Sequence, residues 1–182
     1  MLIIMMASHS FSPLSSSTAH TLVLGTMPGQ ASLVAHQYYA HPRNAFWPIM
    51  LAILKVSELS YISAHALDYS QRCSLLVQGG YALWDVLASC ERPGSLDSRI
   101  VRSSEQANDI GDYIQNHPAL SCIACNGKSA EKLLVRHCQS VLDEQQRQGR
   151  QIRLVSLPSS SPAMASLSLT EKHQRWAEGL LG

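Results

Sequence analysis

The chain has 182 residues, and its 14 lysines and arginines nearly balance its 13 aspartates and glutamates, which gives a net charge of +1. One domain of this length can bury a sizeable core. The charge balance excludes proteins that hold nucleic acid by a strongly basic surface alone. Any phosphate contact must be local, made by backbone amides and serines with help from Arg43, Arg92, Arg99 or Lys128.

The five cysteines are odd in number and scattered, which argues against the disulfide framework of a secreted protein and favours a reducing cytoplasm. Cys122 and Cys125 have CxxC spacing but lie within an apolar run. We expect them to be buried and inert rather than a redox or metal site, because no second Cys/His pair has ligand spacing.

Residues 1–6 are apolar, lack a basic leader, and are too short for a signal peptide or a membrane-spanning helix. Met5 or Met6 could equally be the natural start. Because residues 8–17 are rich in serine, we expect a flexible tail at 1–18 before a single domain at 19–182. We expect no membrane association, and a cytoplasmic protein that is associated with the nucleoid if the source is bacterial.

Strand and helix patterns alternate along the chain. In chain order we predict a strand at 21–24, helices at 31–37, 45–54 and 60–77, a strand at 81–87, an exposed loop at 89–97, a helix at 108–116, a strand at 120–125, a helix at 128–140, a surface connection at 143–150, a strand at 151–157 and a helix at 169–181. Asn44 is a candidate N-cap for the second helix.

This alternation predicts an α/β protein with three layers, α/β/α, around a central, largely parallel sheet of four to five strands. In such folds the ligand crevice lies beyond the carboxyl ends of the strands. The turns after Leu24, Leu87, Cys125 and Leu157 should therefore converge on one site.

Two loops carry the strongest functional signal. Residues 25–29 (GTMPG) and 157–163 (LPSSSPA) each follow an apolar run and offer backbone N–H groups and serine hydroxyls of the kind that hold phosphate. The segment 38–47 (YYAHPRNAFW) adds aromatic surface and polar groups beside the first loop. This combination favours a nucleotide or nucleic-acid substrate whose base is recognised as well as its phosphate.

Together with GYALWDVL, which is followed by GSLDS, and the NGKSA turn, these motifs resemble the uracil-DNA glycosylase superfamily. The similarity runs from Leu24 to about Ala165, within the branch of hypoxanthine (deoxyinosine) DNA glycosylases, close to the mismatch-specific thymine/uracil glycosylases. The resemblance implies a monofunctional enzyme that flips a deaminated base out of double-stranded DNA and hydrolyses its N-glycosidic bond. It implies no metal and no organic cofactor, and we expect a monomer.

In the mismatch-specific relatives an asparagine precedes the proline of the first turn and orients the attacking water; Met27 stands there in this chain. A thioether cannot do this well. The resemblance places Asn44 at the pocket wall, and its amide can both donate and accept, so Asn44 is our candidate catalytic residue. The alternative is a helix cap with no further role.

The resemblance also assigns base-binding residues. Tyr39 matches the aromatic that stacks on the flipped base, while Tyr38 is expected to pack inside. Asp85 lies where relatives read the base, and as an acceptor it would suit the N1–H of hypoxanthine; the alternative is a capping or ion-pair carboxylate, for instance with Arg92 or Arg99. Asn126 could reach the base edge or merely form an Asn-Gly turn. The base-binding set is Gly25, Thr26, Tyr39, Asp85 and Asn126.

Ser159, Ser160 and Ser161 should hold the phosphates that flank the flipped nucleotide, with Ala163 and Met164 as the wedge that enters the gap in the duplex. The alternative is a serine-rich surface loop without a role. Two other functions remain open: a uracil/thymine mismatch glycosylase, which Met27 argues against, and a binding module for DNA lesions without catalysis.

Overall fold

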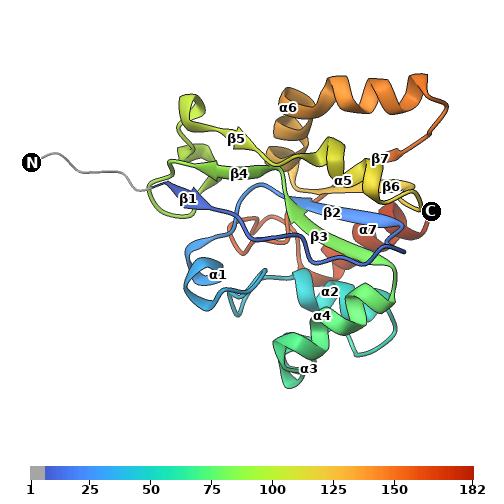
Figure 1. Ribbon diagram of the computed structural model, residues 1–182. Helices are drawn as coiled ribbons and strands as arrows, with labels where there is room; N and C mark the ends of the chain where they lie inside the picture. The colour runs from blue at the N-terminus through green and yellow to red at the C-terminus, as the bar shows by residue number, and fades with distance from the viewer. Residues whose placement is uncertain (1–6) are drawn as a thin grey trace, which may run out of the picture.

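The computed structural model describes residues 7–182. Its fold is built on a parallel sheet of four strands (Figure 1). In the spatial order β3-β2-β6-β7, these strands are Tyr81–Asp85, Thr21–Gly25, Cys122–Asn126 and Arg153–Leu157. All three pairings are parallel. The central strands β2 and β6 are buried along almost their whole length, as expected for a sheet covered on both faces.

Helices cover both faces of this sheet. They are α1 (Gln30–Ala35), α2 (Phe46–Ile53), α3 (Tyr61–Ala66), α4 (Tyr69–Gln78), α5 (Ile110–Asn116), α6 (Lys128–Arg147) and α7 (Leu169–Leu181). Apolar side chains of α5 and α6 pack against Leu22 and Leu24 on one face, while those of α2, α4 and α7 pack against Val23 on the other. Figure 1 shows α5 and α6 above the sheet and α2 to α4 below it. The predicted three-layer α/β/α class is confirmed.

A second, antiparallel sheet lies beside the first. Its three short strands are β1 (Ser8–His9), β4 (Leu87–Cys90) and β5 (Gln106–Ala107), and two single 3-10 turns, Asp97–Arg99 and Arg102–Ser104, lie between β4 and β5. The predicted strand 81–87 is therefore wrong in extent, because the chain leaves the main sheet after Asp85. Strand β3 therefore ends at Asp85. The turn that we expected after Leu87 is absent from that place, because Leu87 begins strand β4.

Part of the expected tail at 1–18 is packed on the domain. We call residues 8–14 the N-terminal strap. β1 pairs with β4, the indole of Trp84 donates to the Phe11 carbonyl at 3.0 Å, and Leu14 forms an isolated bridge with Leu83. This segment is therefore ordered by main-chain pairing and not a loose tail, while residues 1–6 lie outside the described part of the chain. A single domain at 19–182 stays a prediction.

Three predicted elements differ in extent. The helix expected at 60–77 is two helices, because Asp68 begins α4 with a capping box that it forms with Gln71. Helix α6 continues to Arg147, so most of the connection expected at 143–150 is helical. The loop 89–97 is not wholly exposed, because β4 runs to Cys90 and Arg92 is buried.

The cysteines of the CxxC pair are both buried, as predicted, and burial raises the pKa of the Cys125 thiol to about 12. Over residues 7–182, no helix combines the length and the apolar character needed to cross a membrane.

Candidate active site

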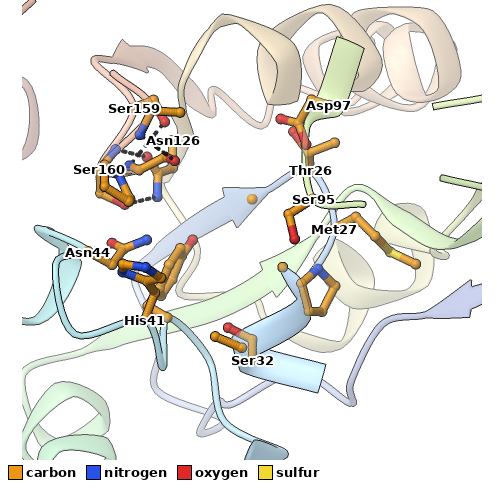
Figure 2. A pocket seen from close by; sticks show the side chains of 18 of the residues that line it. Thr26, Met27, Ser32, His41, Asn44, Ser95, Asp97, Asn126, Ser159 and Ser160 are labelled. Carbon is orange, nitrogen blue, oxygen red and sulfur yellow. Dashed lines mark hydrogen bonds between the residues drawn. The ribbon is translucent and has the colours of Figure 1, made fainter. Parts of the chain in front are cut away.

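One pocket of about 530 Å³ opens at the carboxyl ends of the four parallel strands. The turn after β2, the last residue of β3, the last residue of β6 and the loop after β7 all contribute to its wall, and residues 95–98 close another side. Figure 2 shows Asn44 and His41 at one side of the space, with Thr26 and Asp97 at another. Every predicted site residue lines this pocket: Gly25, Thr26, Tyr39, Asn44, Asp85, Asn126, Ser159, Ser160, Ser161, Ala163 and Met164.

The floor of the pocket depends on Gly25 having no side chain. A Cβ atom at this position would lie 2.4 Å from Oδ1 of Asp85 and 3.2 Å from the hydroxyl oxygen of Tyr39. Any larger residue would therefore displace two polar groups that meet over the end of β2. Met27, two residues on, packs in the apolar cluster under α5 and α6 and also lines the pocket, where its thioether is a weak acceptor and cannot donate to a water.

Asp85 is a buried carboxylate with one oxygen already engaged. Ser10 of the N-terminal strap donates to Oδ2 at 2.7 Å, which leaves Oδ1 beside Gly25. Burial raises the pKa of Asp85 to about 7, against the opposing effect of the Ser10 hydrogen bond. Among residues 7–182 the carboxylate makes no ion pair, so the alternative of a pair with Arg92 or Arg99 is wrong; Arg92 pairs with Asp97 instead.

Tyr39 presents an aromatic face to the pocket. Its backbone has φ of +55°, an uncommon conformation for a bulky residue, and its ring stacks on Phe46 with centroids 4.0 Å apart and planes at 18°. Among residues 7–182 its buried hydroxyl has no partner at hydrogen-bond distance, and burial raises its pKa well above the ordinary value, with the nearby Asn126 side chain opposing this. Tyr38 is buried, as predicted, and its hydroxyl donates to the Ser12 carbonyl at 3.2 Å.

Asn44 contacts the start of α2 and also lies in the pocket wall, but the N-cap of this helix is Ala45, so the predicted N-cap is one residue off. Oδ1 of Asn44 accepts the N–H of Phe46 at 3.0 Å, which satisfies one of the free amides at the start of α2. The amide nitrogen, Nδ2, is the second polar group of the Asn44 side chain in the pocket wall. Cap and site residue are thus compatible roles for one side chain.

Asn126 is joined to Ser160 by two hydrogen bonds. Its Oδ1 accepts the backbone N–H of Ser160 at 2.8 Å, and its Nδ2 donates to the Ser160 hydroxyl at 2.8 Å; both are drawn in Figure 2. The Ser160 carbonyl in turn accepts the N–H of Ala45 at 2.9 Å. Asn126 therefore ties the end of β6 to the loop after β7, and that loop to the start of α2.

The serine loop uses its own backbone amides internally. The N–H of Ser161 donates to the hydroxyl of Ser159, and the N–H of Ala163 to the hydroxyl of Ser161, each at 3.2 Å. We expected amides of this loop to point outward toward phosphate, and for these residues that is wrong. A phosphate at this loop would instead receive the hydroxyl hydrogens of the serines.

The sequence is similar to that of known proteins. No family model matches it. A protein named hypoxanthine DNA glycosylase from Methanosarcina barkeri is 30% identical over 125 residues, which cover 69% of this chain and 74% of the relative. The chain belongs to the hypoxanthine DNA glycosylase branch of the uracil-DNA glycosylase superfamily.

A second protein of the same name, from Methanosarcina acetivorans, is 31% identical over 109 residues, 60% of this chain and 64% of the relative. The solution NMR structure of a candidate uracil DNA glycosylase from M. acetivorans superposes with a TM-score of 0.71 at 26% identity, covering 95% of this chain and 99% of the other. The resemblance read from the motifs is confirmed.

The sequence analysis of this chain missed part of the pocket wall. Asp97 lines the pocket and forms an ion pair with Arg92 at 3.5 Å, while Arg92 also donates to the carbonyl of Pro28. Burial raises the pKa of Asp97, and the Thr26 hydroxyl and the charge of Arg92 oppose this. The GSLDS motif signalled that this segment matters, but no pattern in the sequence indicated that a buried arginine holds it.

Arg92, a predicted helper for phosphate, is instead engaged by Asp97 and the Pro28 carbonyl, so its charge is already paired within the protein. A different cation lies next to the serine loop: Lys172 of α7 donates to the Ser161 carbonyl at 3.2 Å. Its position on a helix distant in sequence gave no signal.

Proposed function

We propose that this protein is a monofunctional DNA glycosylase that removes hypoxanthine from deoxyinosine in double-stranded DNA and leaves an abasic site. One observation carries the proposal: an aromatic face, a buried acceptor and a serine loop, from distant segments, line the same pocket at the strand ends. The membership of the chain in the hypoxanthine DNA glycosylase branch supports the same substrate class.

The base is recognised by Tyr39 and Asp85. The ring of Tyr39 rests on Phe46, so its other face is available to stack on an extruded base, an interaction worth about 1–3 kcal/mol. Oδ1 of Asp85 accepts the N1–H of hypoxanthine. Adenine carries a bare N1 acceptor at that edge and is rejected, because two acceptors would face each other in a buried site.

In the hydrolysis the N-glycosidic bond breaks, the base leaves with the bonding electrons, and the sugar becomes oxocarbenium-like before water adds to it. The amide of Asn44 orients the attacking water or a sugar oxygen, a role that the buried Met27 cannot fill. The flanking phosphates stabilise the positive sugar. The reaction needs no cofactor.

The DNA backbone is held at the serine loop. The hydroxyls of Ser159, Ser160 and Ser161 donate to the phosphates, and Asn126 fixes Ser160 in place rather than reading the base itself. Ala163 and Met164 lie at the pocket rim and enter the gap in the duplex, with Met164 as the larger wedge. We expect the enzyme to act as a monomer in the cytoplasm, at the nucleoid if the source is bacterial.

A panel of lesion duplexes tests this function. Purified protein is incubated with duplexes that contain inosine, uracil, xanthine or a thymine mismatch, with an undamaged duplex as control, and abasic products are cut with alkali. We expect product from inosine above all others. Excision confined to uracil or mismatched thymine would assign the enzyme to the neighbouring class, and binding without any product would show a lesion-binding module.

A further inference from the structure

Lys172 is a buried cation directly beneath the serine loop. It lies in the first turn of α7 and is only 5% exposed, and its ammonium group donates to the carbonyl of Ser161 at 3.2 Å. Lysine is rarely buried unless it is paired. The position of this charge therefore needs a reason.

Within residues 7–182, no carboxylate lies within ion-pair distance of Lys172. The adjacent acid, Glu171, is held in the capping box of α7, where it accepts from the backbone N–H of Ser168 at 2.8 Å. Burial accordingly lowers the pKa of Lys172. An ammonium group out of water and without an anion costs free energy, which an arriving anion would recover.

The loop above Lys172 is itself neutral. Its hydroxyls can donate to a phosphate, but the amides of Ser160, Ser161 and Ala163 already donate within the protein. The net charge of the whole chain is only +1. Among residues 7–182, Lys172 is the cation that hydrogen-bonds this loop, so it is a direct source of positive charge for a phosphate held there.

We propose that Lys172 is a DNA-binding residue that provides the positive charge for the phosphodiester at the Ser159–Ser161 loop. The inference rests on the proposed function only in taking the anion to be the DNA backbone. The Ser161 contact places the ammonium against the backbone of the loop, and the proposal requires the lysine side chain to exchange this carbonyl for a phosphate oxygen.

The test uses Lys172→Met, which keeps an unbranched chain of similar length and suits a buried position. Binding of an undamaged and an inosine duplex is measured by fluorescence anisotropy over a range of salt concentrations. We expect the Kd to rise about tenfold and the slope of log Kd against log salt to fall by about one, because one fewer counterion is released.

Two variants serve as controls. Lys172→Arg should keep the wild-type salt slope, and Lys55→Met, an exposed cation beyond the far end of α2, should leave both Kd and slope unchanged. A weaker Kd with an unchanged slope in Lys172→Met would mean that the lysine only supports the loop, and would overturn the inference. Because binding is also measured on undamaged DNA, this test does not depend on excision. If the wild type excised no base but Lys172→Met still showed the smaller salt slope, the proposed function would be refuted and this inference would stand.

Discussion

At the level of single residues, the pocket depends on the smallest one in it. In Gly25→Ala the new methyl group would sit 2.4 Å from Asp85 Oδ1, so this carboxylate must move. We expect a folded protein whose kcat/KM on inosine duplex falls by about 100-fold, the scale of a 1 Å misplacement of a reacting group. Single-turnover excision and circular dichroism measure the two effects. Gly111→Ala, on α5 and outside the pocket, should keep wild-type excision, with only a small shift of Val141, 3.3 Å from the new Cβ; wild-type excision by Gly25→Ala would contradict the geometry.

Asn44 has two roles that substitution can separate. Asn44→Ala removes both the cap and the amide, and we expect turnover to fall by about 10² to 10³. Asn44→Ser keeps an acceptor for the Phe46 N–H but cannot reach as far, so it should retain the melting temperature while still losing turnover. Wild-type turnover in either variant would leave Asn44 as a cap alone.

The residues of the pocket were predictable where they sit at strand ends. Gly25, Asp85 and Asn126 close β2, β3 and β6, and parallel strands bring such ends together. Arg92 and Lys172 were not predictable, because their importance comes from burial next to loops far away in the chain. A sequence pattern shows that a residue is charged, but not that tertiary packing has removed it from water.

At the level of secondary structure, the Asn126–Ser160 contact joins the end of β6 to the loop between β7 and α7. Asn126→Ala removes both hydrogen bonds and leaves the N–H of Ser160, a residue 1% exposed, without its acceptor. We expect a loss of about 1–3 kcal/mol in the free energy of unfolding and a higher KM for DNA. Urea unfolding and steady-state kinetics measure these quantities.

Asn126→Asp is the matched variant, since it keeps the acceptor for the Ser160 N–H and loses the donor. It should fall between the wild type and Asn126→Ala in stability. If Asn126→Ala instead kept full stability and changed only the preference among bases, Asn126 would be a base reader and not a support of the loop.

The same level explains which elements could be predicted. Strands β2, β6 and β7 and helices α1, α2, α5 and α7 were located by apolar periodicity with Gly, Pro or Asn at their ends. The break between α3 and α4 was missed because the apolar pattern continues through it, while the capping box of Asp68 starts a new helix. β1, β4 and β5 are too short for a periodic signal and exist through mutual pairing.

At the level of the whole molecule, the N-terminal strap reaches the active site. Ser10 and Asp85 are 75 positions apart, and their hydrogen bond of 2.7 Å links the strap to the floor of the pocket. The strap is held by β1–β4 pairing and by the contacts of Phe11 and Leu14 with strand β3. A segment whose serine-rich composition predicted a loose tail thus donates a hydrogen bond that lowers the pKa of the Asp85 carboxylate, against the larger rise caused by burial.

This coupling predicts a pH dependence. Asp85 accepts the N1–H of hypoxanthine only as a carboxylate, and its pKa is about 7, so excision should increase as the pH rises through about 7. The Ser10 hydroxyl stabilises the charged form and lowers this pKa, so Ser10→Ala should raise it and shift the midpoint of the rate profile to higher pH. Single-turnover rates on inosine duplex across pH 5–9 would measure the shift, with Ser17→Ala, an exposed serine outside the pocket, as control.

Stability should change in the opposite direction. The folded pKa of Asp85 lies above the ordinary value of 3.8, so its contribution to stability is fully present below about pH 4 and is lost as the pH rises through about 7. Asp85→Asn cannot ionise and should therefore gain melting temperature relative to the wild type between pH 4 and pH 8. A rate profile that Ser10→Ala leaves in place would show that the strap does not shift the pKa of Asp85. A wild type whose stability tracks Asp85→Asn at every pH would show that this pKa is not raised in the folded protein.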